Sequence, residues 1–177
     1  VRSGRVVGGG PDGSFAAERL ARAGLKTTVV DGMLAWEKPC GGGLTFKAYN
    51  TYPVLIENST PKKLVTHTHL SAPRAGCVSM PLGQPLVIYS RYDLNNMLLQ
   101  RAGDAGAQIE KTRVLEVKRA NRGWELKKRN GVAQADYCIV ANGARNSLRN
   151  VGTEYTASDT MFALGYYVPT NQDHIDI

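Results

Sequence analysis

The chain has 177 residues, enough for one well-filled core, and its hydrophobic fraction of 42% and charged fraction of 21% are ordinary for a globular protein. Its net charge of +7 comes from Lys and Arg spread along the chain, so the stripe of basic residues that marks a nucleic-acid partner is not expected. The three cysteines are widely spaced and form no C-x-x-C pair, which argues against a disulfide framework or a zinc ribbon. No apolar run is long enough to span a membrane, and we expect a protein of the reducing cytoplasm.

The first predicted elements form a βαβ unit. Residues 5–7 are a short apolar strand, and apolar side chains recur at helical spacing over residues 14–23 before the expected stop at Gly24. The stretch "KTTVVD" is a second buried strand that ends at Asp31. A right-handed crossover would make the two strands parallel.

Between this first strand and helix lies "GGGPDG", residues 8–13, which fits the dinucleotide fingerprint G-x-G-x-x-G. The first glycine permits a tight turn, the second lets backbone N–H groups approach a phosphate, and the third lets the helix sit close to the sheet. The N-terminus of the helix adds a partial positive charge. The candidate cofactor-binding residues here are Gly8, Gly10, Pro11, Gly13 and Ser14, with Asp31 placed to accept hydrogen bonds from an adenosine ribose.

Asp12 does not suit this interpretation, because it puts a carboxylate where a pyrophosphate should come close. At about 4–5 Å and an effective dielectric near 20, the repulsion would be around 1 kcal/mol or more. A side chain that points into solvent would soften it. We expect the fold of the turn to survive and its affinity for a dinucleotide to be much weakened or lost.

The residue pattern of the sequence changes over residues 54–90. A glycine-rich loop and a short helix over Phe46–Tyr52 come first, and then "KLVTHTHLSAP", "GCVSMPL" and "QPLVIYS" are short strands separated by Pro and Gly. We interpret this part as a different sheet inserted into the nucleotide domain. His67 and His69 would share one face of a strand, but no third ligand accompanies them, so no metal site is expected.

Helical spacing returns after residue 90, where Leu94, Leu98 and Ala102 share a face and Gly106 marks the end. Strands follow at "TRVLEVKRA" and "WELKKR", with "NG" at 130–131 as a hairpin signal. "ADYCIVANGAR" is a buried strand that runs into a glycine turn, and "MFALGYYVP" is a further strand near the end.

The segment "EKPCGGGL", residues 37–44, contains three consecutive glycines, whose backbone could lie against a flat ring system. Joined to the glycine fingerprint, it resembles the geranylgeranyl reductase family of FAD-dependent oxidoreductases, within the p-hydroxybenzoate hydroxylase-like superfamily. The resemblance implies that Cys40, Gly41 and Gly42 lie beside the isoalloxazine ring. It makes Cys40 the candidate catalytic residue, although a free Cys is most often an inert thiol.

Three further positions are implied by the same resemblance. Arg91 would contact the FAD, backbone atoms around Val114 and Leu115 would meet the adenine, and the "ANGAR" segment matches a motif in which an Asp holds the ribityl chain. That position carries Asn, which keeps hydrogen-bonding capacity but loses the charge. Gly32 stands where a basic residue is common. The candidate residues in the last segment are Asn142, Gly143 and Arg145.

The fold class that follows is α/β, a Rossmann-like FAD/NAD(P)-binding domain with an interleaved, partial β-rich substrate domain. We predict a first FAD-binding part at 1–53, a substrate-domain insertion at 54–90, a second FAD-binding part at 91–152, and the start of a second substrate segment at 153–177. The resemblance covers essentially the whole chain but only the N-terminal part of such a protein. We therefore expect half of an interleaved enzyme or a truncated product, which association with another chain would complete.

The implied activity is reduction of C=C bonds in an isoprenoid lipid by hydride transfer from reduced flavin, with NAD(P)H or ferredoxin as electron donor. Peripheral contact with a membrane is compatible with such a substrate. Two other readings stay open: a flavin-dependent monooxygenase or halogenase, and a non-catalytic remnant that acts as a binding module. A yellow protein would favour an enzyme, and a colourless protein that takes up no FAD would favour the remnant.

Overall fold

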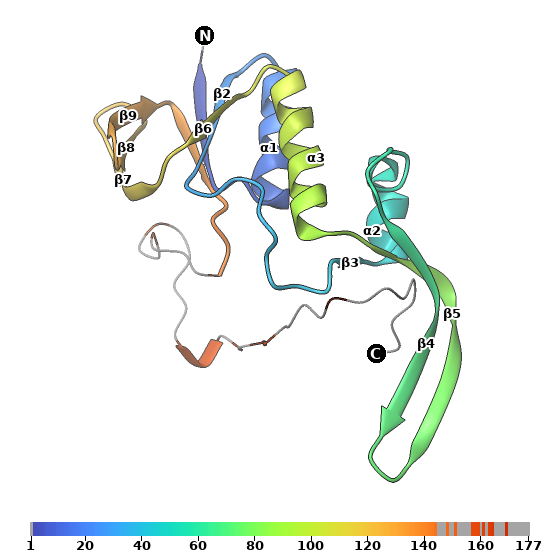
Figure 1. Ribbon diagram of the computed structural model, residues 1–177. Coiled ribbons are helices and arrows are strands. Elements are labelled where there is room, and N and C mark those ends of the chain that lie inside the picture. Colours follow the sequence, from blue (N-terminus) through green and yellow to red (C-terminus); the bar gives the residue numbers. More distant parts are fainter. Residues whose placement is uncertain are drawn as a thin grey trace. The chain divides into compact units, whose positions relative to one another are not determined.

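The computed structural model describes residues 2–144 and, after them, residues 148, 151, 157–159, 161, 163, 164 and 169 (Figure 1). The chain divides into two compact units, one with the described residues of Val1–Trp36 and Leu94–Ala163, the other with those of Glu37–Asp93 and Leu164–Ile177. The helices are α1 (Pro11–Arg22), α2 (Phe46–Thr51) and α3 (Arg91–Asp104), with short 3₁₀ turns at Pro53–Leu55 and Ala157–Asp159.

The first unit is built on a parallel sheet of four strands in the order β10-β1-β2-β6. The strands are β1 (Ser3–Val7), β2 (Lys26–Asp31), β6 (Gln108–Lys111) and β10 (Tyr137–Val140). The predicted βαβ unit is confirmed, since β1, α1 and β2 follow one another and the two strands pair in parallel. β1 begins two residues earlier than predicted, and α1 begins at Pro11 rather than Ser14 because proline fits the first turn of a helix.

Both faces of this sheet are buried, which explains the consecutive valines of β2. Val6 and Val29 pack with residues of α1 and α3 on one face, and Val7 and Val30 pack on the other face. The second face is covered by an antiparallel sheet of three strands, and Leu126 lies fully buried at its centre. Those strands are β7 (Val114–Arg119), β8 (Trp124–Lys128) and β9 (Gly131–Ala135).

The sequence prediction missed β6 altogether. This strand has only four residues, "QIEK", and three of them are exposed because it lies at the edge of the sheet beside β2. The hairpin predicted at Asn130–Gly131 is confirmed, with Lys128 paired to Gly131 across the turn. The strand predicted at "MFALGYYVP" lies largely outside the described residues.

In the second unit, β5 pairs with both β3 (Gly43–Leu44) and β4 (Lys63–Ala72) in an antiparallel sheet (Figure 1). The prediction of several short strands was wrong, because β5 runs from Gly76 to Ile88 through Pro81, Gly83 and Pro85. The pairing register with β4 shifts between Val65 and His67, which leaves part of β5 without ladder partners. A bulge of this kind accommodates prolines that cannot donate a hydrogen bond.

The chain divides into its two compact units near Trp36 and Asp93. These limits of the units differ from the domain boundaries predicted at 53 and 90. Those boundaries concern function and stay a prediction. No helix in the described part of the chain is long and apolar enough to cross a membrane.

Helices α1 and α3 are joined by a buried ion pair. The Glu18 carboxylate, with 4% of its side chain exposed, accepts hydrogen bonds from Arg101 Nη2 at 2.6 Å and Arg101 Nε at 3.1 Å. Arg22 Nε donates to the same carboxylate at 3.0 Å. The paired guanidinium groups satisfy a carboxylate that would otherwise be costly to bury.

Replacing Glu18 should therefore destabilise the protein. Glu18→Ala leaves the one-third-exposed Arg101 without its partner, and we expect a loss of about 2 kcal/mol in the free energy of unfolding. Urea denaturation of Glu18→Ala and of the exposed control Glu116→Ala would measure it, with the control changing by less than about 0.5 kcal/mol. Equal losses in the two variants would contradict the structural role.

Candidate functional site

The glycine turn connects β1 to α1 by a very close approach of backbone to backbone. Gly8 has φ +109° and donates its N–H to the Val30 carbonyl at 3.0 Å, and Ala141 N–H donates to the Val7 carbonyl at 2.7 Å. A Cβ on Gly8 would overlap the Ala141 carbonyl, and a Cβ on Gly13 would overlap the Gly8 carbonyl oxygen. The first and third glycines of the fingerprint are thus required by the fold itself.

The second glycine is different. A Cβ on Gly10 would meet no protein atom within 4 Å, and the backbone of Gly10 is extended, with φ −70° and ψ −178°. No side chain caps the N-terminus of α1. The first N–H groups of a helix have no partner within it, so the amides of Asp12 and Gly13 are available to an anion that approaches through the open space at Gly10.

Asp31 holds this turn to the end of β2. Its Oδ2 accepts the Gly9 N–H at 2.7 Å, and its Oδ1 accepts those of Met33 at 2.6 Å and Leu34 at 2.8 Å. These bonds fix a loop in which Leu34 has φ +60°. The carboxylate has about four acceptor positions, so one is left for the ribose hydroxyl that the sequence analysis predicts.

Ser14 and Asp12 have roles that differ from each other. The buried Ser14 hydroxyl donates to the Gly9 carbonyl at 3.1 Å, and its amide donates to the Gly10 carbonyl, so both donors serve the turn. Its contact with a cofactor stays a prediction. Asp12 is exposed, which softens the repulsion expected between its carboxylate and a phosphate.

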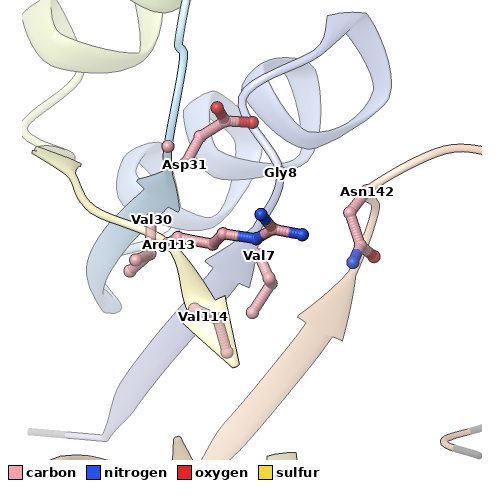
Figure 2. Close-up of a pocket in the computed structure, with 8 residues that line it drawn as sticks. Val7, Gly8, Val30, Asp31, Arg113, Val114 and Asn142 are labelled. Atoms are coloured by element: carbon pink, nitrogen blue, oxygen red, sulfur yellow. The ribbon is translucent and has the colours of Figure 1, made fainter. Parts of the chain in front are cut away.

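A pocket of about 120 Å³ opens beside the turn, at the carboxyl ends of β1, β2 and β10. Figure 2 shows Asp31 and Asn142 on either side of Gly8, with the guanidinium of Arg113 between them. Ligands of open parallel sheets bind at this end of the strands. The pocket is lined by Val7, Gly8, Val30, Asp31, Gly32, Arg113, Val114 and Asn142.

The pocket unites several predicted residues and adds others. Gly8, Asp31 and Asn142 meet there, and Val114 rather than the exposed Leu115 lines it. Gly143, with φ +70°, follows directly, and Arg145 lies outside the described residues. Sequence analysis missed Arg113, since an Arg before a strand has no distinguishing pattern.

The second cluster lies in the other unit, where the Glu37 carboxylate caps α3. Its oxygens accept the Arg91 N–H at 2.9 Å, the Tyr92 N–H at 3.2 Å and the Ser90 hydroxyl at 2.5 Å. This cap fixes the start of the "EKPCGGG" segment beside the start of α3, a favourable place for a negative charge. Sequence analysis did not predict the role of Glu37.

Cys40 lies in this cluster with an exposed thiol. A hydrogen bond from the Gly42 backbone and one from the Arg91 side chain lower the pKa of Cys40 below the usual 9.0. Gly42 has φ +67°, and a Cβ there would overlap the Tyr89 carbonyl. Gly41, by contrast, has open space around its Cα. The arrangement presents a thiolate-prone sulfur on a backbone with little side-chain bulk.

The comparisons with known proteins agree with this geometry. No protein-family model matches the chain. Geranylgeranyl diphosphate reductase of Rhodobacter capsulatus is 32% identical over 152 residues, which are 82% of this chain and 38% of that protein. The crystal structure of a geranylgeranyl bacteriochlorophyll reductase-like protein from Thermoplasma acidophilum has a TM-score of 0.64 at 25% identity, over 80% of this chain and 39% of that one.

A halogenase crystallised with phloroglucinol and FAD has a TM-score of 0.62 at 18% identity, over 79% of this chain and 34% of its own, which shows a shared fold. The parallel sheet with its glycine turn and interleaved antiparallel sheet is thus the fold of FAD-dependent oxidoreductases and monooxygenases. Within that class, the chain belongs to the geranylgeranyl reductase family, as its resemblance predicted. It spans about two-fifths of the length of the first of these relatives.

Two substitutions separate the structural glycines from the one that faces open space. Gly13→Ala should destabilise the fold by about 2 kcal/mol or more, because the turn must shift to admit the new Cβ. Gly10→Ala should change stability by less than about 0.5 kcal/mol yet weaken FAD binding at least about tenfold, because its Cβ occupies the space a phosphate would approach. Urea denaturation and FAD titration measure the two effects. Unchanged FAD affinity in Gly10→Ala would show that no ligand approaches this backbone.

Cys40 should react with iodoacetamide at lower pH than Cys138, whose pKa burial raises to about 11. The thiolate is the reacting form, and because the pKa of Cys40 is lowered, its thiolate forms at a lower pH than that of an ordinary thiol. Arg91→Gln removes one stabilising group and should move the midpoint of Cys40 alkylation to higher pH.

Alkylation is followed site by site with mass spectrometry, and the exposed Cys77 serves as the control for access of the reagent. If the midpoint of Cys40 stays in place in Arg91→Gln, the guanidinium does not stabilise the thiolate.

Proposed function

We propose that the chain binds FAD through the glycine turn and takes part in the reduction of an isoprenoid C=C bond. The observation that carries this proposal is the open N-terminus of α1 above Gly10, with the Asp31 carboxylate beside it, in a chain of the geranylgeranyl reductase family. When bound, FAD supplies the hydride-transfer chemistry, and the protein supplies binding and orientation.

The residues of the first unit fit the adenosine diphosphate half of this cofactor. The amides of Asp12 and Gly13 would bind the diphosphate, and the remaining acceptor position of Asp31 would take a ribose hydroxyl. Val114 gives an apolar wall suited to the adenine. Asn142 at the end of β10 would hydrogen-bond a hydroxyl of the ribityl chain, without the charge of an Asp.

For the "EKPCGGG" segment we propose contact with the flavin ring. The small backbone of Gly41 leaves room for a flat ring, and Arg91 and Cys40 would set the charge at its edge. A catalytic part for the Cys40 thiol is included in this proposal. NAD(P)H or ferredoxin would supply the electrons, and the isoprenoid is the substrate class suggested by the names of the relatives.

Titration of the purified chain with FAD tests the proposal. We expect quenching of flavin fluorescence on binding, with an affinity reduced by Asp12. The chain with reduced FAD is then offered geranylgeranyl diphosphate, and an aromatic substrate with oxygen in a parallel reaction. Saturation of the lipid product's double bonds supports the reductase, and hydroxylation or halogenation of the aromatic compound would favour a monooxygenase or halogenase instead. A chain that takes up no FAD would be a non-catalytic module.

Asp12→Ala should tighten FAD binding about fivefold, which corresponds to roughly 1 kcal/mol of repulsion for an exposed charge near a phosphate. The gain should shrink as salt concentration rises. Asp104→Ala, at the exposed C-terminal end of α3, changes net charge equally and should leave the affinity as it is. Equal affinities of Asp12→Ala and the unsubstituted chain would place the carboxylate away from the bound phosphates.

A further inference from the structure

The pocket beside the glycine turn contains one charged group to which neither the sequence motifs nor the fold assign a role. Arg113 lies between β6 and β7, and among the described residues that line the pocket it is the only cation. Figure 2 shows its guanidinium reaching across the pocket in front of Gly8, between Asp31 and Asn142. The guanidinium thus lies in the space that a ligand would enter and is not packed in the protein core.

The backbone that carries this side chain is held from two sides. The Arg113 carbonyl accepts the Arg129 N–H at 3.0 Å, and the Thr112 hydroxyl donates to Asn130 Oδ1 at 3.1 Å, so the turn between β8 and β9 fixes the chain before β7. Val114, the next residue, is 6% exposed. Arg113 is thus presented to the pocket by a rigid support, although its own side chain is exposed.

Gly32 lies beside the base of this side chain. A Cβ on Gly32 would lie at ordinary van der Waals distance from it, 3.5 Å from Arg113 Cβ and 3.8 Å from Arg113 Cα. Within the described part of the chain, the guanidinium makes no ion pair. A guanidinium carries five N–H donors with which it can bind an anion.

The negative charges around the site favour a cation such as this guanidinium. A diphosphate bound at the turn would lie near two carboxylates, Asp31 in the pocket wall and Asp12 in the first turn of α1. The helix terminus alone offers only a partial positive charge. A guanidinium matches phosphate oxygens in a forked geometry and offsets the negative field.

We propose that Arg113 holds the diphosphate of the dinucleotide against the glycine turn and offsets the repulsion from Asp12. This inference rests on the proposed function, because it takes the adenosine diphosphate half of FAD as the ligand. Arg113 is thus a binding residue for the phosphates and sets the affinity of the site.

Calorimetric titrations with FAD, ADP and adenosine test the assignment in the chain, in Arg113→Gln and in Arg113→Lys. Arg122→Gln, an exposed arginine outside the pocket, is the control for net charge. We expect Arg113→Gln to weaken FAD and ADP about tenfold and leave adenosine unchanged, because adenosine has no phosphate. Arg113→Lys should keep part of the affinity, and Arg122→Gln all of it.

Equal ADP affinities in the chain and in Arg113→Gln would overturn the inference and leave the proposed function standing. An equal loss for adenosine and ADP would also overturn it, since the guanidinium would then contact the adenine or the ribose. If the unsubstituted chain binds ADP but not FAD, the proposed function fails while the Arg113 comparison is still decided with ADP. If it binds neither nucleotide, both fail.

Discussion

The close contact between Gly13 and the carbonyl of Gly8 is the constraint on which the site depends. It lets the N-terminus of α1 lie directly above the end of β1, because a Cβ at Gly13 would force the helix away, whereas a Cβ at Gly8 would overlap the Ala141 carbonyl that follows β10. Asp31 then fixes the other side of the turn through Gly9, and its bonds to Met33 and Leu34 fix the loop that follows β2. The turn, the end of β2 and the loop after it are thus held together by the hydrogen bonds of one carboxylate.

The sequence predicted those parts of the fold that are governed by local patterns. The βαβ unit, the helical face of Leu94, Leu98 and Ala102 and the hairpin at residues 130–131 all follow from residue spacing and turn residues, and the structure contains them. The sequence prediction failed where the course of a strand depends on partners that are distant in the chain. β6 is a polar edge strand that pairs only because β2 is beside it, and β5 continues through two prolines because a bulge relieves its ladder.

The residues of the candidate site likewise divide into those that local sequence patterns predict and those that they do not. Glycine spacing and the acid at the end of β2 identified the turn, because each of those residues meets a backbone requirement visible in the sequence. Sequence patterns could not identify Arg113 and Glu37, because the roles of these residues depend on which loops the fold brings together. The "EKPCGGG" segment was identified through family resemblance, and the structure adds its physical content: a capped helix start, a lowered thiol pKa and a glycine that no other residue could replace.

We propose that the backbone amides at the start of α1 bind the phosphates of a flavin dinucleotide. A titration of the ¹⁵N-labelled chain with FAD, followed by two-dimensional NMR, tests it most directly. We expect large, saturable shifts of the Gly10, Asp12 and Gly13 amide signals, with little change at Gly9, whose N–H already binds Asp31. Saturation of the protein with FAD while those three signals stay in place would contradict it.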